Sequence, residues 1–170
     1  MINRAQFLLL LGSLLLSENA LPHAPAKFRV IFFLDPECPV TNAYMAEIKK
    51  ITGDYAGKDI AFEAIFPMQT IKDADISAFL KKYNAGISGR KDPGLQQSKR
   101  YKATVMPEVV VLNAAGLPVY QGAIDNWYYA LGKSRPKATE HYLRNALDAA
   151  LAGDPVLVSK TEAFGCLINL

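Results

Sequence analysis

The alternation of two apolar patterns in the first part of the chain is the feature that most constrains its fold. Residues 27–34 read K-F-R-V-I-F-F-L, an aromatic and β-branched run that ends at an Asp-Pro pair. Such a run is typical of a strand buried on both faces. Apolar residues then recur at steps of three and four, which predicts an amphipathic helix over 39–55. Because residues 60–66 form a second strand-like run, the pattern predicts a β-α-β unit.

Helix signals continue beyond this unit. Asp73 or Asp75 can cap a helix that continues through Tyr83. Residues 84–91 show no clear period and are expected to be irregular. In the next segment, 92–101, an Asp-Pro pair supplies an N-cap and a first helical residue, which predicts a short helix.

The remaining elements form a hairpin, a helix and a tail. Two apolar runs, 108–112 and 118–121, flank an Asn-Ala-Ala-Gly turn and are expected to be paired strands. Leucines at four-residue spacing predict a last helix over 139–151, which ends at Gly153. The order of all these elements specifies a three-layer α/β/α sandwich around a mixed central sheet. Residues 154–170 remain as a C-terminal tail.

The composition fits one ordinary globular domain. The chain has 170 residues, of which 51% are apolar, and this is enough to build a single core. The formal net charge of +3 is spread over several short Lys and Arg pairs rather than gathered in one block. Such dispersed charge is typical of solvated helix faces. We therefore expect no nucleic-acid partner.

The N-terminal segment has the pattern of a secretory signal peptide. Arg4 supplies a positive start, and residues 7–16 are almost entirely apolar. The run is about half the length that a spanning helix needs, so we expect no stable membrane insertion after processing. Residues 1–26 are thus predicted to be a signal peptide that directs export to the periplasm, with cleavage after Ala20 or Ala26.

The chain has two cysteines, Cys38 and Cys166, and neither belongs to a C-x-x-C or C-x-x-C-H motif. Zinc ribbons and covalent haem attachment are therefore not supported. Cys38 directly precedes Pro39 at the start of a predicted helix, where the helix dipole favours a thiolate. The nearby carboxylates of Asp35 and Glu37 act against that anion, so the net effect is not fixed by the sequence. No metal or other cofactor is expected.

Four segments carry a resemblance to a known family. They are F-F-L-D-P-E-C-P-V-T-N-A-Y-M-A-E-I, V-M-P-E-V-V-V-L-N-A-A-G, Y-Q-G-A-I-D-N and T-E-A-F-G-C-L-I. With these segments in this order, the chain resembles bacterial redoxin-domain proteins of the thioredoxin-like superfamily. Within that superfamily it is similar to the alkyl hydroperoxide reductase and thiol-specific antioxidant proteins. The resemblance implies a thioredoxin-like domain over 27–153. It also implies that Cys38 is the reactive thiol and that Pro107 is a cis-proline facing it. If so, the backbone before Pro107 would offer main-chain groups to an extended peptide.

The chain also departs from that family pattern. Thr41 stands where a thioredoxin-type dithiol would have its second cysteine. A peroxiredoxin would show P-x-x-x-T-x-x-C, but Ile31 and Asp35 stand at its proline and threonine positions. Peroxidase activity by that machinery is therefore not supported by these residues.

These observations lead to three functional hypotheses. The first is an exported thiol-disulfide oxidoreductase or thiol-based antioxidant that acts through Cys38 and is resolved by Cys166 or by an external thiol. Its partner would be a thiol, disulfide or peroxide substrate, proteins included. The second is a non-catalytic binding module with a structural Cys38–Cys166 disulfide. The third and weakest is copper handling through Cys38 and methionines, for which there is no clustered ligand motif.

The candidate site follows from the first hypothesis, although the sequence leaves open whether the two cysteines pair. The expected catalytic residues are Cys38 and Cys166. The residues expected to position a substrate are Met106, Pro107, Pro39 and Thr41. His23 lies in or near the segment expected to be cleaved, and His141 lacks a partner at metal-ligand spacing, so neither is assigned as a ligand.

Overall fold

A computed structural model of the protein describes residues 26–130 and 132–170. All but the last residue of the expected signal peptide lies outside the described residues. Within the described ranges, no helix is both long and apolar enough to cross a membrane.

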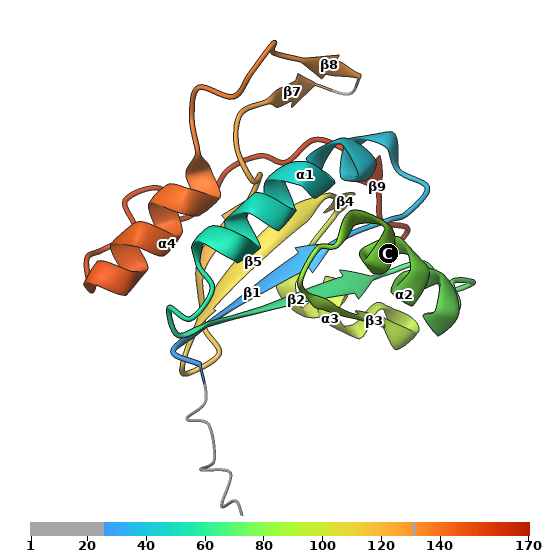
Figure 1. Ribbon diagram of the computed structural model, residues 1–170, viewed down its shortest axis with the longest axis horizontal. Coiled ribbons are helices and arrows are strands. Elements are labelled where there is room, and N and C mark those ends of the chain that lie inside the picture. Colours follow the sequence, from blue (N-terminus) through green and yellow to red (C-terminus); the bar gives the residue numbers. More distant parts are fainter. Residues whose placement is uncertain (1–25, 131) are drawn as a thin grey trace, which may run out of the picture.

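The centre of the molecule is a five-stranded mixed sheet with the order β3-β2-β1-β5-β6 (Figure 1). The central strand β1 runs parallel to β2 and antiparallel to β5. The four expected strands, β1, β2, β5 and β6, are confirmed, with bounds within one residue of those predicted. The five strands are β1 (Phe28–Phe33), β2 (Ile60–Phe66), β3 (Ser88–Lys91), β5 (Glu108–Asn113) and β6 (Pro118–Gly122).

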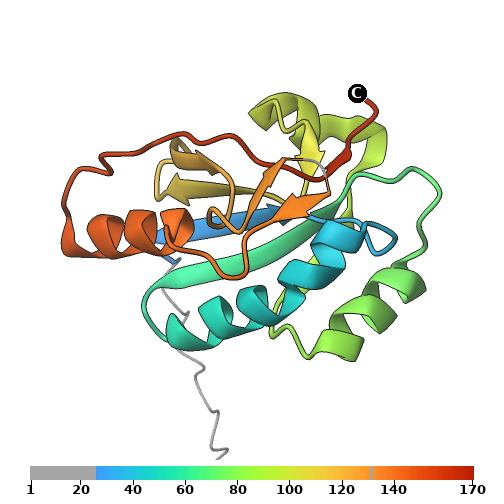
Figure 2. The same ribbon diagram turned by 90° about the horizontal axis from the view of Figure 1, so that it is seen from above.

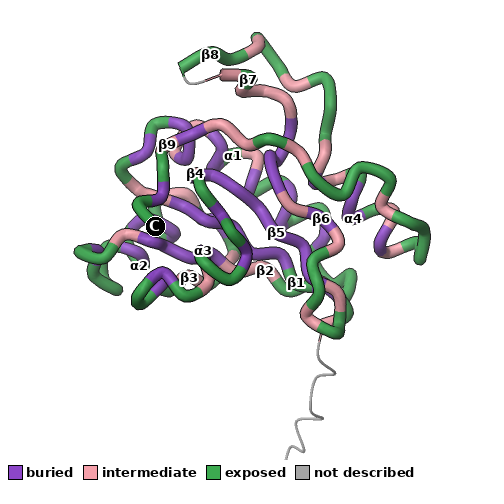
Figure 3. Tube along the Cα trace, turned by 180° about the vertical axis from the view of Figure 1, so that it is seen from behind, coloured by how far each residue is buried: buried purple, intermediate pink, exposed green. Residues whose placement is uncertain are grey.

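Helices cover both faces of this sheet and complete the three layers. The side chains of β1 alternate between two cores, with Val30 and Phe32 in one and Ile31 and Phe33 in the other. The first core is covered by α1 (Pro39–Asp54), α2 (Asp73–Tyr83) and α4 (Tyr142–Ala152). The second core is covered by the 3₁₀ turn η1 (Pro93–Leu95), by α3 (Gln96–Tyr101) and by the end of the tail. Figure 3 shows that the central strands are buried along most of their length.

Two short strand pairs lie outside the main sheet. The pair β7 (Tyr128–Ala130) and β8 (Lys133–Ser134) projects from the body of the molecule, as Figures 1 and 3 show. The pair β4 (Val105–Met106) and β9 (Cys166–Leu167) joins the loop before β5 to the C-terminal tail. Figure 2 shows this tail running from the end of α4 across the molecule to the side of α3.

The expectation that residues 84–91 are irregular is wrong over its second half, which forms β3. The segment Ser-Gly-Arg-Lys pairs with β2 through its backbone and has no apolar alternation. Its Gly89 lies so close to α2 that an added Cβ would be 2.7 Å from Leu80 and 2.9 Å from Ile76. The strand therefore depends on main-chain pairing and close packing, which leave no periodic pattern in the sequence.

Helix starts also differ from the expected ones. The N-cap of α2 is Lys72, while Asp75 accepts a hydrogen bond from the Lys72 backbone at 3.1 Å. Asp92 is the N-cap residue of η1 and Pro93 its first residue, as predicted, but the Asp92 carboxylate accepts hydrogen bonds from the backbones of Gln97 and Ser98 in α3.

The last helix, α4, starts three residues later than predicted. The side-chain oxygen of Asn126 accepts hydrogen bonds from the backbones of Thr139 and Glu140, at 2.8 and 3.1 Å. These two residues are held to Asn126 in an irregular segment, and the helix begins only at Tyr142, after the N-cap residue His141.

Candidate functional site

Cys38 occupies the N-cap position of α1, directly after the bend that follows β1. Its backbone N–H donates to the Asp35 carbonyl at 3.1 Å, and its carbonyl accepts from the Asn42 backbone at 3.0 Å. Pro39 is the first helical residue, a position where the missing N–H leaves no hydrogen bond unmade. The cysteine is 1% exposed, so the rest of the site covers it almost completely.

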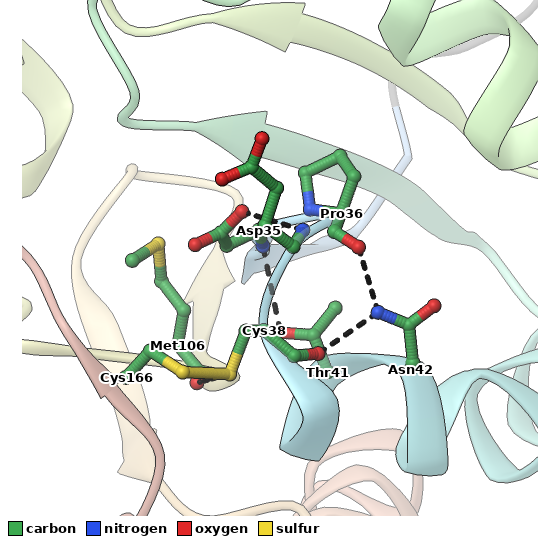
Figure 4. Close-up of a disulfide and its surroundings, with 8 residues drawn as sticks. Asp35, Pro36, Cys38, Thr41, Asn42, Met106 and Cys166 are labelled. Atoms are coloured by element: carbon green, nitrogen blue, oxygen red, sulfur yellow. Dashed lines mark hydrogen bonds between the residues drawn. A yellow bond between two sulfur atoms is a disulfide. The ribbon is translucent and has the colours of Figure 1, made fainter.

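Cys38 is bonded to Cys166 in a disulfide, with the two Cα atoms 5.9 Å apart (Figure 4). The bond joins the start of α1 to a tail 128 residues further along the chain. Cys166 is partly exposed and is the more accessible of the two residues. The pairing that the sequence left open is therefore present, and the tail docks on the domain.

The tail reaches Cys38 as an added strand. In the β4–β9 pair, Met106 lies opposite Cys166 and Val105 lies opposite Leu167, in antiparallel register. The backbone of Ile168 continues this pairing, because its N–H donates to the Thr104 carbonyl at 2.8 Å. The Met106 carbonyl oxygen also lies 3.2 Å from the Cys38 sulfur. The backbone of β4 thus contacts both halves of the disulfide.

Gly165 makes the close approach of the tail to β4 feasible. A Cβ atom added to this residue would overlap the carbonyl group of Met106 and would lie 3.2 Å from the ring of Pro107. Any larger residue here would push the backbone away from β4, so the tail needs glycine directly before its cysteine.

The side chains that follow Cys166 alternate between solvent and core. Leu167 is 72% exposed, whereas Ile168 is 7% exposed and belongs to the second core. This alternation is the usual period of a strand, and here it places one aliphatic side chain of the tail inside the domain.

A second attachment holds the tail at β6, an edge strand of the main sheet. The Gln121 backbone donates to the Ser159 carbonyl at 3.0 Å and accepts from the Thr161 backbone at 3.1 Å. The Thr161 hydroxyl accepts from the Ala123 backbone at 2.9 Å and lies 2.7 Å from the Tyr120 hydroxyl. The tail is thus fixed at Thr161 before it crosses to Cys166.

Asn42 fixes the loop that carries Cys38. Its side-chain amide donates to the carbonyls of Pro36 and Cys38, at 2.7 and 2.9 Å (Figure 4). Its side-chain oxygen accepts from the Tyr83 hydroxyl at 2.6 Å, which ties the loop to α2. The sequence analysis did not single out Asn42, although its position four residues after Cys38 puts both on one side of the helix.

Glu108 fixes β4 from the opposite side. It is 6% exposed and follows Pro107 directly. Its carboxylate accepts hydrogen bonds from the Thr104 backbone at 3.0 Å and from the Gln121 side chain at 2.7 Å. A buried carboxylate with these two donors links the residue before β4 to β6, and no sequence motif marks Glu108.

Of the four residues expected to position a substrate, three are buried and Pro39 is exposed. The Met106–Pro107 bond is cis, as the resemblance implied, and both residues are buried beside the disulfide. Pro39 is exposed at the start of α1. Thr41 is fully buried, and its hydroxyl accepts from the Asp35 backbone at 3.4 Å, so it faces the loop.

The two carboxylates near Cys38, those of Asp35 and Glu37, make no hydrogen bond to the disulfide. Asp35 accepts a hydrogen bond from the Glu37 backbone at 2.8 Å, within its own loop, and Glu37 is exposed. Among the residues that the structure describes, no group of three or more His, Cys, Asp or Glu side chains is arranged to hold a metal ion.

A buried pair, Tyr44 and Asp125, connects α1 to the segment before β7. The Tyr44 hydroxyl donates to the Asp125 carboxylate at 2.6 Å, and the Trp127 backbone donates to the same oxygen at 2.8 Å. Burial raises the pKa of Asp125 above its ordinary value, against the lowering effect of the two hydrogen bonds. Burial, together with the bond to Asp125, also raises the pKa of Tyr44. The rings of Trp127 and Tyr128 pack against Tyr44, so this aromatic run has a packing role.

No protein-family model matches the sequence, and no curated protein is similar to it. Several solved structures are similar in fold. A hypothetical protein from Sinorhizobium meliloti is 25% identical, with a TM-score of 0.72 over 85% of this chain and 80% of its own. An uncharacterized conserved protein from Geobacillus kaustophilus is 23% identical, with a TM-score of 0.72 over 85% of this chain and 78% of its own.

A third similar structure has a described activity. It is a secreted disulfide oxidoreductase from Mycobacterium tuberculosis, homologous to E. coli DsbE, that is 20% identical to this chain. Its TM-score is 0.51 over 75% of this chain and 82% of its own. These likenesses, with the mixed sheet and its helix layers, confirm the thioredoxin-like fold that the sequence predicted.

Proposed function

We propose that this thioredoxin-like chain is an exported thiol-disulfide oxidoreductase in which Cys38 and Cys166 are the working redox pair. The observation that carries the proposal is the disulfide between the N-cap of α1 and a strand added at β4. The likeness to a secreted disulfide oxidoreductase supports it further. Export rests on the signal-peptide pattern of residues 1–26 alone.

Reduction of the disulfide starts at Cys166, the more exposed residue. An external thiolate attacks the Cys166 sulfur and forms a new disulfide with it, while the bond to Cys38 breaks and its electron pair stays on the Cys38 sulfur. The N-terminus of α1 favours this anion, and a stabilised leaving thiolate departs faster. A second external thiol then releases Cys166 as a thiol and leaves as part of an external disulfide.

The reduced enzyme works in the opposite direction on its substrate. The Cys38 thiolate attacks a substrate disulfide, one substrate sulfur leaves as a thiolate and takes up a proton, and a mixed disulfide remains at Cys38. Cys166 then attacks the Cys38 sulfur, which restores the internal disulfide and releases the second substrate thiol. Two electrons pass from the cysteine pair to the substrate in one cycle.

A disulfide fits this chain better as a substrate than a peroxide. Thiol peroxidases of the resembling family surround their cysteine with a proline and a threonine, and the corresponding residues here are Ile31 and Asp35. Ile31 is fully buried in the second core, and Asp35 bonds to its own loop. An antioxidant role would therefore have to proceed through disulfide exchange rather than through direct attack on a peroxide.

The non-catalytic alternative is favoured by one observation, the burial of Cys38 at 1% exposure. A structural disulfide has a reduction potential below about −300 mV, whereas a working one is easier to reduce. A bridge across 128 residues would also contribute about 4–5 kcal/mol to stability in the chain-entropy model. The two hypotheses therefore predict different reduction potentials for the disulfide and different losses of fold stability when it is removed.

The deciding experiment uses Cys166→Ser, with Cys38→Ser as its matched control. Each full-length variant is incubated with a protein disulfide, and adducts are identified by mass spectrometry while thermal unfolding is followed in parallel. We expect Cys166→Ser to remain folded and to trap a mixed disulfide at Cys38, and Cys38→Ser to trap none. A large loss of stability in Cys166→Ser together with an unreactive Cys38 would replace the oxidoreductase by the binding module.

A further inference from the structure

We propose that a pocket between α1 and the segment that leads from β6 to α4 binds a short aliphatic amino acid, whose ammonium group bonds to Asp125. The pocket has a volume of about 470 Å³, and neither cysteine lines it. Residues of α1 form one side, and residues within 125–141 form the other. The inference is independent of the redox activity proposed above.

Asp125 supplies a buried carboxylate with one free oxygen. The residue is 5% exposed and lines the pocket. Both of its hydrogen bonds, from the Tyr44 hydroxyl and the Trp127 backbone, go to Oδ1. Within the described part of the chain no donor bonds to Oδ2, and this oxygen keeps contact with solvent. It is therefore the oxygen that can accept a hydrogen bond from a ligand in the pocket.

No cationic side chain among the described residues forms an ion pair with this carboxylate. Glu47, the other carboxylate that lines the pocket, is paired with Arg144 at 2.9 Å. Burial raises the pKa of Asp125, which reflects the free-energy cost of an ionised group at this place. An ammonium group in the pocket would offset that cost through a charge-assisted hydrogen bond to Oδ2.

A single available oxygen favours an ammonium group over a guanidinium group. A guanidinium ion binds a carboxylate best through two parallel hydrogen bonds, which need both oxygens. Oδ1 of Asp125 already accepts two bonds, so only Oδ2 is open. An ammonium ion is a compact charge that one oxygen can hold. Trp127 also lines the pocket, and an indole ring attracts a cation over its face.

The rest of the lining fits a short aliphatic chain that ends in a carboxylate. Ala43, Ala46 and Ala138 have small side chains and leave room for methylene groups. Lys50 and Lys137 line the pocket from its two sides and are exposed. Their ammonium groups repel a second positive charge and attract a negative one. The ligand is therefore an amino acid with its two charges at opposite ends, rather than a diamine.

The side of the pocket opposite α1 is held in place without a ligand. The Arg135 backbone donates to the Trp127 carbonyl at 2.8 Å, and the Trp127 indole N–H donates to the Arg135 carbonyl at 2.8 Å. The Asn126 side chain accepts from the backbones of Thr139 and Glu140. These bonds join the two ends of the segment beside the pocket, so a ligand does not have to order it.

Isothermal titration calorimetry with probes of equal chain length tests the site in the full chain. ε-Aminocaproate carries an ammonium group and a carboxylate, hexylamine only the ammonium group, hexanoate only the carboxylate, and hexamethylenediamine two ammonium groups. We expect ε-aminocaproate to bind about threefold more tightly than hexylamine, hexylamine more tightly than the diamine, and hexanoate not at all. Hexylamine also represents a lysine side chain of a protein, so this order assigns the site to a free small molecule.

Variants of the charged lining test the role of each end of the ligand. Asp125→Asn removes the charge but keeps an oxygen for the existing hydrogen bonds, and it should weaken the binding of ε-aminocaproate at least about tenfold. Asp148→Asn makes the same change in a Tyr–Asp pair outside the pocket lining and should keep the affinity within about twofold. Lys50→Gln with Lys137→Gln should reduce the affinity for ε-aminocaproate to that of hexylamine.

Ala46→Leu tests the pocket without altering its charges. Leucine is a good helix former, and at this exposed position of α1 its side chain would fill part of the pocket. Binding should be lost, whereas Lys49→Leu, on the same helix but outside the pocket lining, should bind as the native chain does. Circular dichroism spectra show whether each variant is folded.

The outcomes that would overturn the site are distinct from those that test the redox activity. Absence of binding to the native chain at millimolar ε-aminocaproate would refute the site, as would undiminished binding in a folded Asp125→Asn or Ala46→Leu variant. Equal affinities for ε-aminocaproate and hexanoate would show that the ammonium group is not recognised. A preference for hexylamine or the diamine would refute an amino acid as the ligand.

Discussion

Met106 is the antiparallel partner of Cys166. Its carbonyl oxygen also lies 3.2 Å from the sulfur of Cys38, so one short strand contacts both cysteines. Because β4 has only two residues, it relies on neighbours for its position. Glu108 provides this support, since it bonds to the backbone just before β4 and to the side chain of Gln121.

Gly165→Ala should make the disulfide easier to reduce. The added Cβ would overlap the Met106 carbonyl and push the tail off β4, which weakens the oxidised state. A loss of about 1.4 kcal/mol would raise the reduction potential by about 30 mV. Equilibration in dithiothreitol buffers measures this change.

Gly53→Ala is the matched control for that variant. An added Cβ there meets nothing within 4 Å, and the residue is part of α1. The change should stabilise the helix by about 0.5–1 kcal/mol and leave the potential of the disulfide unaltered. Equal potentials for Gly165→Ala and the unmodified protein would contradict the role of Gly165.

Asn42→Ala should loosen the loop that carries Cys38. The change removes donors to the carbonyls of Pro36 and Cys38 and the acceptor for the Tyr83 hydroxyl. We expect a loss of about 1–3 kcal/mol in the free energy of unfolding and a changed alkylation rate of Cys38 in the reduced protein.

Tyr83→Phe separates these contributions, because it removes only the bond from α2 to Asn42. It should lower stability by about 1 kcal/mol without altering the alkylation of Cys38. Should both variants change that rate equally, Asn42 would act through α2 rather than through the loop.

Asp125→Asn should raise the free energy of unfolding more at neutral pH than at acidic pH. Burial raises the folded-state pKa of Asp125, so the folded protein binds this proton more tightly than the unfolded chain. The resulting stability is fully present below the ordinary pKa of the carboxyl and is lost as the pH rises through the raised value. The asparagine cannot ionise and avoids that loss, while its oxygen can still accept from Tyr44 and Trp127.

Denaturant unfolding of Asp125→Asn at several pH values between about 3 and 8 measures the difference. Asp148→Asn removes a carboxylate from a second Tyr–Asp pair, with Tyr55, and controls for the change in net charge. A stability difference that does not vary with pH would show that the charge of Asp125 has no part in it.

Thr161→Val should free the tail from the edge of β6. The valine has nearly the same shape but loses the hydroxyl that accepts from Ala123 and meets Tyr120. We expect a loss of about 1–3 kcal/mol and faster proteolysis of residues 154–170. Ser159→Ala is the control, because Ser159 is exposed and its bond to Gln121 uses the backbone carbonyl. Equal proteolysis of the two variants would contradict this anchor.

The exported protein should lack its N-terminal segment, from Met1 to at least Leu16. The mass of the periplasmic form should correspond to cleavage after Ala20 or Ala26. A double variant, Leu9→Arg with Leu10→Arg, interrupts the apolar run and should remain in the cytosol with its N-terminus intact. Export of this variant, or an uncleaved native chain in the cytosol, would refute the signal-peptide assignment.

Four strands of the main sheet, β1, β2, β5 and β6, and the helices α1 and α4 could be predicted because each carries an apolar run or an apolar period. The bounds of β2, residues 60–66, agree with the prediction, and α1 ends within one residue of its expected end. The strands β3, β4 and β9 could not be found in this way. Each has two to four residues and forms through backbone pairing with a distant segment, so its own side chains carry no period.

The site was only partly predictable for a similar reason. The position of Cys38 follows from the end of a strand and from Pro39 at the start of a helix, both of which are local signals. Its pairing with Cys166 depends on where the tail docks, which is decided by Thr161 and Ile168 in contact with residues far away in the sequence. Gly165 was visible beside Cys166, but its need for a hydrogen side chain appears only against Met106.

The span of the disulfide has a mechanical consequence. In the oxidised chain, the disulfide between Cys38 and Cys166, which are 128 positions apart, closes the intervening residues into a covalent ring. A force applied to the two termini of the chain cannot extend the residues inside this ring. Reduction makes the whole ring extensible, which at about 3.4 Å per residue corresponds to roughly 430 Å of additional contour length. One bond near the surface thus decides whether the protein behaves under tension as a short tether or as a long one.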